Sequence, residues 1–434
     1  MITTAFVHIW GETVGAVAWD SDRELASFEY NNAFLQRGWE LAPLKMPLSA
    51  GQTIFDFPRL RKKRERELDA FRGLPGLLAD SLPDQYGNQL IDRWLARQGR
   101  PPDSMNPVEK LCFIGKRGMG ALEFEPAYFE RDPGSTGIEI ESLVEMARTM
   151  LSRRADFSTN LDKDDQAMKQ ILRVGTSAGG ARPKAVIAYN RRTSEVRSGQ
   201  AKAPEEFEHW IIKLDGVSEV QLGETTGYGR VEMAYYRMAI DCGIDMMHSK
   251  LLEENGRAHF MTRRFDREDD GTKHHIQTLC AMKHFDYNDV QSYSYEQLFQ
   301  TMRELKLDYP SSEQMFRRMV FNVLARNCDD HTKNFAFRLQ KDGKWELAPA
   351  YDLCHAYRPG SEWVSQHALS INGARKDIQR KDLLAVADTI NIRKAPAIID
   401  QINGMVGKWP RYAEQAGVDP GLRDAISETL INLP

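Results

Sequence analysis

Residues 327–352 read NCDDHTKNFAFRLQKDGKWELAPAYD, and this stretch is the most informative indication of the fold. Asp329 and Asn334 follow a helix that we expect at 311–326, because its apolar residues fall on one face. Two β-rich runs on either side of a Lys-Asp-Gly-Lys turn then predict a β-hairpin that ends just before Asp352. The hairpin is expected to bring the two polar ends of the stretch back together.

The spacing of these polar residues is typical of phosphoryl transfer. Asp329 and Asn334 have the D-x-x-x-x-N spacing of a kinase catalytic loop, and Asp352 follows where that arrangement has its metal-binding aspartate. One carboxylate would orient a hydroxyl nucleophile, while the amide and the second carboxylate would hold Mg²⁺ on phosphates. About one such spacing is expected by chance in a chain of this length. The inference of a kinase-like site therefore rests on the position of this spacing just before the hairpin. Asp330 adds an adjacent carboxylate, and the spacing favours Asp329 as the base.

Two upstream segments carry groups that could contact phosphates. Residues 177–184 read SAGGARPK, and the backbone N–H groups of such a glycine-rich turn can approach phosphates closely. This turn is not a Walker A sequence, and a plain turn would use its glycines in the same way. Lys213 stands among apolar strand residues, where it could pair with phosphates or extend from an edge strand into water. Glu232, on the next predicted helix, is a candidate ion-pair partner for Lys213.

The composition excludes a disordered chain. Of the 434 residues, 41% are hydrophobic, and 58 Lys and Arg nearly balance 62 Asp and Glu, which argues against general coating of nucleic acid. The five cysteines are odd in number and include no C-x-x-C pair, so we expect buried thiols in a reducing compartment. No run approaches the roughly 18 apolar residues that span a bilayer, and no signal peptide is recognisable. We therefore expect a cytoplasmic protein without a membrane partner.

The remaining pattern places β-rich sequence before a helix-rich half. A hairpin within 5–18 and a strand at 25–30 predict a β-rich N-terminal unit. The basic run at 59–67 is interpreted as solvated surface without a chemical role, because Glu65 and Glu67 interrupt it. The other expected elements are helices at 85–98, 138–152, 164–174, 230–242 and 293–305, and strands at 185–189, 209–214, 259–265, 335–339 and 345–348.

Taken together, the motifs resemble those of the HipA family, the serine/threonine kinase toxins of bacterial toxin–antitoxin modules. The resemblance covers nearly the whole chain in the family's order: DSLPD at 80–84, the turn 177–184, IIKL at 211–214, RFDR at 264–267, the loop 329–334, and the Tyr-Asp pair 351–352. It implies an α+β class: a bilobal protein-kinase-like fold with an extra β-rich N-terminal subdomain and an all-helical C-terminal lobe. The expected domains are a HipA-type N-terminal subdomain at 1–130, a nucleotide-binding lobe at 131–262, and a helical C-terminal kinase lobe at 263–434.

The resemblance also implies roles for single residues. Asp329 would be the catalytic base, Asn334 and Asp352 would hold Mg²⁺, and Ser177 would be the autophosphorylated serine. A phosphate on Ser177 would oppose the triphosphate of ATP and pull the turn out of the site.

A second group of residues would contact ATP. Arg263 and Phe265 would belong to the hinge at the adenine, Asp266 would contact the ribose, and Lys213 would pair with the phosphates. The rest of the implied ATP-contacting set is Gly179, Gly180, Ala181, Arg182, Pro183, Lys184, His331, Lys333, Asn334 and Asp352.

The implied activity is phosphorylation of a protein serine or threonine, dependent on ATP and Mg²⁺. The protein would be the toxin of a HipA/HipB-like type II module, arresting growth and causing persistence by modifying a translation-related protein such as an aminoacyl-tRNA synthetase. A HipB-like antitoxin would restrain it, and DNA contact would be indirect, through that antitoxin. Two alternatives stay open: a kinase of small molecules or lipids, and a non-catalytic co-repressor subunit that clamps a DNA-bound antitoxin.

Overall fold

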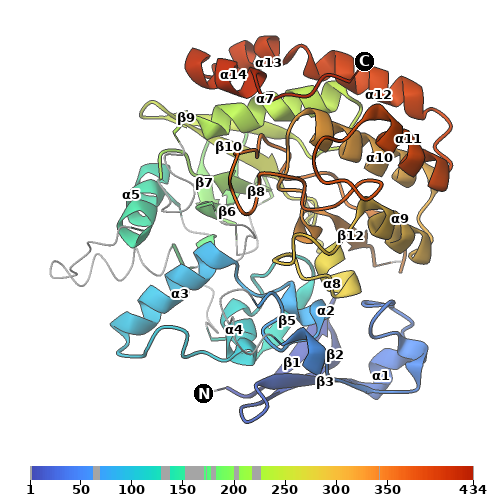
Figure 1. The fold of residues 1–434 in the computed structure, drawn as a ribbon. Coiled ribbons are helices and arrows are strands. Elements are labelled where there is room, and N and C mark those ends of the chain that lie inside the picture. Colours follow the sequence, from blue (N-terminus) through green and yellow to red (C-terminus); the bar gives the residue numbers. More distant parts are fainter. Residues whose placement is uncertain are drawn as a thin grey trace.

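The computed structural model describes residues 2–61, 69–128, 137–151, 171–172, 174–176, 182–199, 205–217, 226–341 and 343–433. Within these ranges the chain forms two five-stranded sheets and one three-stranded sheet, all antiparallel, with helices packed around them (Figure 1). Part of the expected helix at 164–174, most of the basic run, and Ser177, Gly179, Gly180 and Ala181 lie outside the described residues.

The N-terminal sheet has the strand order β4-β3-β2-β1-β5. Its alternating sequence buries one face: in β1, Ala5, Val7 and Ile9 are fully buried while their neighbours are at least partly exposed. This confirms the predicted β-rich N-terminal unit. The elements are β1 (Thr4–Ile9), β2 (Glu12–Asp20), β3 (Leu25–Tyr30), α1 (Asn32–Leu35), β4 (Ile54–Phe55), α2 (Gly76–Ala79), α3 (Gln85–Arg97), α4 (Pro107–Ile114) and β5 (Leu122–Glu125).

The second sheet has the order β7-β6-β8-β10-β9 and forms the middle layer in Figure 1. All six residues of β6 are buried, because helices and the neighbouring units cover the sheet. The register sets Lys184 of β6 and Phe260 of β10 directly opposite Lys213, the last residue of β8. The elements are α5 (Ile140–Leu151), β6 (Lys184–Tyr189), β7 (Val196–Ser198), β8 (Glu208–Lys213), α7 (Tyr228–Asp241), β9 (Ser249–Glu254) and β10 (Arg257–Arg263).

The C-terminal region is predominantly helical. It differs from the expected all-helical lobe because it also contains the three-stranded sheet β11-β12-β13. This sheet contains the predicted hairpin, with β11 added on one side. The elements are β11 (His275–Thr278), α8 (Leu279–Lys283), α9 (Tyr295–Glu304), α10 (Tyr309–Leu324), the 3₁₀ turn η4 (Thr332–Asn334), β12 (Ala336–Leu339), β13 (Trp345–Leu347), α11 (Arg380–Thr389), α12 (Ala395–Val406), α13 (Trp409–Ala416) and α14 (Pro420–Ser427).

One apolar core joins the inner face of the N-terminal sheet to α7, α10 and α12, and a second core lies between α3, α5 and the middle sheet. The five cysteines are all buried and free, as expected. Across the described ranges, no helix combines the length and apolar character that crossing a membrane requires.

Candidate active site

A buried lysine links two carboxylates at the centre of the site. The ammonium group of Lys213 donates to Glu232 Oε1 on α7 and to Asp352 Oδ1 after the hairpin. Only 14% of the Lys213 side chain and 4% of the Glu232 side chain are exposed, so the ion pairs form largely out of water. Burial opposes the charge of Lys213, but Asp352 and Glu232 outweigh it and raise its pKa. The predicted Lys213–Glu232 pair is therefore confirmed, with Asp352 as a third member.

Asp352 is held in an unusual backbone conformation. Its φ of 52° lies in the left-handed region, which Asp tolerates better than most non-glycine residues. Burial disfavours its charge, yet Lys213 and Lys184 hold the pKa of its carboxyl well below the ordinary value. The neighbouring Tyr351 donates from its hydroxyl to Lys333 O at 2.6 Å, which ties the segment after β13 to the loop 327–334.

The loop 327–334 is closed by its own side chains. Asn334 Nδ2 donates to Asp329 O at 2.6 Å, and the Lys333 N–H donates to His331 Nδ1 at 3.3 Å. Thr332 Oγ1 donates to Phe285 O at 2.7 Å, which fastens the loop to the segment after α8. The loop is thus fixed by hydrogen bonds within itself and to a neighbouring segment.

The two adjacent carboxylates have opposite surroundings. Asp330 is buried and accepts hydrogen bonds from the Tyr295 hydroxyl at 2.9 Å and from the Ala368 N–H at 2.7 Å, and His367 Nδ1 lies 2.9 Å from Oδ2. Half of the Asp329 side chain is exposed. Both oxygens of Asp330 are therefore committed to structure, whereas Asp329 can reach a substrate.

The environment of Asp329 favours proton uptake relative to an ordinary aspartate. Desolvation raises the pKa of its carboxyl, His331 opposes this, and the charges of Asp352 and Asp330 add to it. The nearest ring nitrogen of His331, Nε2, lies 3.7 Å from Asp329 Oδ1. Asp329, His331 and Asp352 thus share one electrostatic environment.

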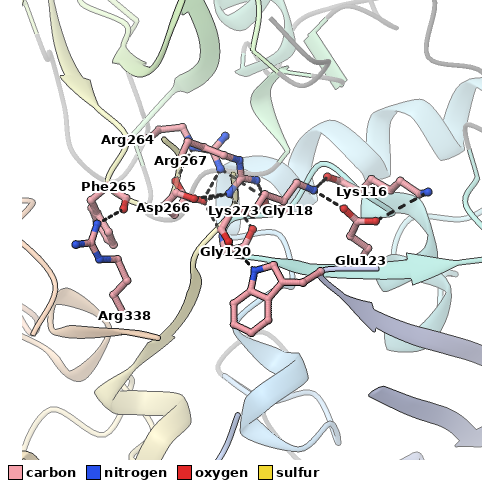
Figure 2. Close-up of polar contacts among 11 residues, drawn as sticks. Lys116, Gly118, Gly120, Glu123, Arg264, Phe265, Asp266, Arg267, Lys273 and Arg338 are labelled. Atoms are coloured by element: carbon pink, nitrogen blue, oxygen red, sulfur yellow. Dashed lines mark hydrogen bonds and ion pairs between the residues drawn. The ribbon is translucent and has the colours of Figure 1, made fainter. Parts of the chain in front are cut away.

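The RFDR segment, residues 264–267, lies at the end of β10 (Figure 2). Asp266 has no exposed side-chain surface, and its oxygens accept from Arg264 Nε at 2.8 Å, Arg267 Nη1 at 2.6 Å and the Gly120 N–H at 2.8 Å. Internal partners therefore surround the carboxylate of Asp266, and its expected ribose contact stays a prediction. Those partners also hold its pKa well below the ordinary value, despite burial.

Phe265 and Arg263 occupy different positions at the same strand end. The Phe265 ring stacks on Tyr351, with centroids 5.7 Å apart and planes 25° apart, and its carbonyl accepts from Arg338 Nη1 at 2.9 Å. The Arg263 guanidinium instead pairs with Asp269. The backbone N–H of Arg263 donates to His248 O at 2.9 Å. The structure therefore brings Phe265, and not the Arg263 guanidinium, next to the Tyr351–Asp352 end of the hairpin.

Further positive groups gather on the same side. The guanidinium carbon of Arg182 lies 4.6 Å from the centre of the Tyr228 ring, and although burial opposes its charge, Cys354 and Glu232 raise its pKa. Burial lowers the pKa of Lys184, which stands opposite Lys213 in the sheet. Pro183 O accepts from the Leu214 N–H at 2.9 Å and continues that pairing.

Family models match two parts of the chain. The model described as the HipA N-terminal domain matches residues 5–125, and the HipA-like C-terminal domain matches residues 176–409, more than half of the chain. The chain belongs to the HipA family.

One solved structure agrees with this HipA assignment at the level of the fold. HipA in the Shewanella oneidensis MR-1 complex of HipA, HipB and operator DNA has a TM-score of 0.67 at 17% identity, covering 98% of this chain and 94% of that one. The Helicobacter pylori proinflammatory kinase CtkA has a TM-score of 0.34 at 12% identity, covering 51% of this chain and 88% of that one. No curated protein sequence gives a significant match. The expected α+β, kinase-like HipA fold is confirmed.

Asp80 lies near the candidate active site, although no role was predicted for it. Asp80, in the DSLPD motif of the N-terminal unit, accepts from the Thr278 N–H at 2.6 Å and from Thr278 Oγ1 at 2.8 Å. The Lys333 ammonium lies 4.7 Å from the Tyr287 ring centre, and although burial opposes its charge, Tyr287 and Asp80 are among the groups that raise its pKa. The motif was visible in the sequence, but its proximity to Lys333 depends on a contact between distant segments.

Proposed function

We propose that this HipA-family protein is a protein serine/threonine kinase that uses ATP and Mg²⁺. The observation that supports this most directly is the buried Lys213–Glu232–Asp352 arrangement beside the half-exposed Asp329. Kinases need a lysine on the phosphates that is held by a helix glutamate, together with an aspartate that binds the metal. The four side chains provide each of these chemical groups.

The residues present have the chemistry needed to hold ATP and Mg²⁺. Asp352 and Asn334 would supply oxygen ligands for Mg²⁺, and Lys213, Lys184 and Arg182 would supply positive charge for phosphates. Among the described residues, no three His, Cys, Asp or Glu side chains form a metal cluster, so phosphate oxygens or water would complete the ligand set. When bound, Mg²⁺ would neutralise charge on the transferred phosphoryl group. The stacked Phe265 and Tyr351 rings would provide a flat surface for the base.

Asp329 would orient the acceptor hydroxyl and take its proton. Its exposure allows a protein side chain to approach, and desolvation raises its pKa, which strengthens it as a proton acceptor. Lys333 and His331, on the same loop, would contact the nucleotide as the resemblance implies. Ser177 would be the site of autophosphorylation.

The biological role that we propose is that of a cytoplasmic toxin restrained by a HipB-like antitoxin. The fold match to HipA in a complex with HipB and operator DNA supports this choice of partner, with DNA contacted through the antitoxin. The substrate would be a translation-related protein, such as an aminoacyl-tRNA synthetase, whose modification arrests growth.

The test is phosphate transfer from labelled ATP to the purified protein in the presence of Mg²⁺. We expect Asp329→Asn to lower the rate about 10²–10⁴-fold, the usual contribution of a general base. Asp388→Asn, an exposed position on α11, is the matched control and should retain the wild-type rate. Mass spectrometry should locate the label on Ser177.

Equal labelling of the wild type, Asp329→Asn and Asp388→Asn would contradict the assigned base. Transfer to small alcohols but never to a protein would replace the proposal with a small-molecule kinase. Unchanged toxicity and operator binding in Asp352→Asn would instead favour the non-catalytic co-repressor.

A further inference from the structure

The RFDR segment is fixed by two regions that are far from it in sequence (Figure 2). The loop 116–120 of the N-terminal unit approaches it from one side, and Arg338 of β12 approaches it from the other. Asp266 and Gly120 are 146 residues apart in sequence. The segment is therefore a junction of three parts of the molecule.

On the N-terminal side, loop 116–120 contributes backbone groups only. Its Gly120 N–H donates to Asp266 Oδ2, and Gly120 O and Gly118 O accept from Arg267 at 2.9 and 3.0 Å. Gly120 has a φ of +77°, and a Cβ there would lie 3.2 Å from the Ile276 N atom. A glycine at this position therefore allows the loop to approach the segment closely.

The charges at this junction are almost completely removed from water. Arg264 is 2% exposed, Asp266 0% and Arg267 9%, and the single carboxylate serves both guanidinium groups. Burial and the neighbouring Arg264 lower the pKa of Arg267 to about 10. Such an arrangement is sensitive to loss of any one member, because the remaining charges stay buried without full compensation.

Between these charged residues lies Phe265. Its carbonyl is held by Arg338, which also pairs with Glu346 on β13, and its ring lies against Tyr351. Since Asp266 follows directly in the chain, fixing its carboxylate to Gly120 also fixes the orientation of the Phe265 peptide. The N-terminal unit thus contacts Asp266 and Arg267, the residues that follow Phe265, and through them constrains the aromatic pair.

We propose that the N-terminal unit positions the nucleotide base: loop 116–120 holds Asp266, and Asp266 holds the Phe265 ring against Tyr351. This inference rests on the proposed function, because it takes the Phe265–Tyr351 pair as the surface for the base. Asp266, Arg267 and Arg338 are then positioning residues that touch no ligand themselves. They determine affinity for the base, while the phosphates would bind elsewhere, at Lys213 and at the Mg²⁺ held by Asp352.

The test compares two ligands, Mg-ATP and Mg-tripolyphosphate, by isothermal titration of the full-length protein. We expect Asp266→Asn to weaken Mg-ATP binding about tenfold, the scale of one base–aromatic stacking contact, and to leave Mg-tripolyphosphate binding unchanged. Arg338→Met loosens the Phe265 carbonyl from the other side and should give the same pattern, which keeps the test available should Asp266→Asn fail to fold.

Lys273→Met is the matched control. Lys273 Nζ donates to Lys116 O at 2.9 Å and to Glu123 Oε1 at 2.7 Å, so the hydrogen bonds of its side chain hold the same loop without involving the side chains of Asp266 or Phe265. This variant should lower the melting temperature and keep the wild-type affinity for both ligands. Equal weakening of both ligands in Asp266→Asn or Arg338→Met, or no weakening of either, would overturn the positioning role. A wild-type protein that binds tripolyphosphate but not ATP would overturn it as well, and one that binds neither would overturn the proposed function together with it.

Discussion

Asp330 and Asp329 show how adjacent carboxylates can differ in environment, one buried and hydrogen-bonded and the other half exposed. Asp330 faces Tyr295, His367 and the Ala368 backbone, whereas half of the Asp329 side chain meets solvent. Fixing Asp330 also limits the movement of Asp329, since both share a short loop. The buried neighbour therefore contributes rigidity to the exposed one.

The buried Asp330–His367 pair should make stability depend on pH. Burial opposes the charge of His367, but Asp330 outweighs it and raises its pKa to about 10, against an ordinary value of 6.5. Because this pKa is raised in the folded state, the stabilisation from the ion pair of charged His367 with Asp330 is complete below pH 6.5. It disappears as the pH rises through 10. We expect His367→Asn to cost about 3–5 kcal/mol in the free energy of unfolding near pH 6, and progressively less toward pH 10.

Urea titrations between pH 6 and pH 10 measure this difference. His355→Asn is the control, because burial lowers the pKa of His355 to about 4 and its ring stays neutral throughout this range. A cost for His367→Asn that does not change with pH, like the one expected for His355→Asn, would rule out a charged imidazole at position 367.

Single residues also show where prediction from sequence succeeded and where it failed. Lys213 and Glu232 were paired correctly, because a lone lysine in an apolar strand requires an anion and the next helix offers one. The ribose contact of Asp266 stays a prediction, and the contact of its carboxylate with Gly120 was not predicted, because Gly120 lies 146 residues away in the sequence. The roles of Ser177 and of residues 179–181 remain predictions.

At the scale of elements, helix α7 carries Glu232 and is held in place by α13. The Tyr412 hydroxyl donates to Asp241 Oδ2 at 2.6 Å, and the Trp409 ring lies 5.2 Å from that of Tyr235. Trp409 is fully buried and its indole N–H donates to Arg423 O at 2.9 Å, which adds α14 to the same assembly. Helices α13 and α14 thus support α7, the helix that carries Glu232.

Trp409→Ala should lower the free energy of unfolding by about 3–5 kcal/mol, because it removes a large buried ring and leaves a cavity. Trp363→Ala is the control: its ring is 40% exposed, and we expect a change within about 0.5 kcal/mol. Chemical denaturation followed by circular dichroism compares the two variants. Similar losses in both would mean that α13 contributes little to the core.

Elements were predictable where their pattern was strong and long. The amphipathic face of α10 and the β-hairpin after it were both identified, and the loop 327–334 lies between them. Strand β11 was missed, because it has only four residues and buries His275 and Gln277 where a strand pattern would have apolar side chains.

At the scale of the whole molecule, the N-terminal unit is part of the fold of the kinase-like region. It shares one apolar core with α7, α10 and α12, and it supplies the Gly118 and Gly120 backbone groups to buried arginines. Asp80 adds a further connection by accepting from Thr278 at the start of α8. The boundary between the family's two domain models therefore does not separate independent units.

A chain that begins at residue 137 should consequently fail to form a native kinase-like region. The exposed apolar face, and the loss of the Gly118 and Gly120 backbone groups that bind Asp266 and Arg267, would favour aggregation or a loosely packed state. Near-ultraviolet circular dichroism and Mg-ATP titration of the shortened chain check this against the full chain. Cooperative unfolding together with full ATP affinity would show that the region folds alone.

The left-handed backbone at Asp352 has a genetic consequence. Asparagine tolerates this conformation nearly as well as aspartate, whereas a β-branched residue would be strained there. Asp352→Asn needs only one nucleotide change, from a GAY to an AAY codon, and it removes the anion without disturbing the chain path. Under the proposed function, selection for silence of this gene would have a one-step route to a folded but inert product, which would still compete for the proposed antitoxin.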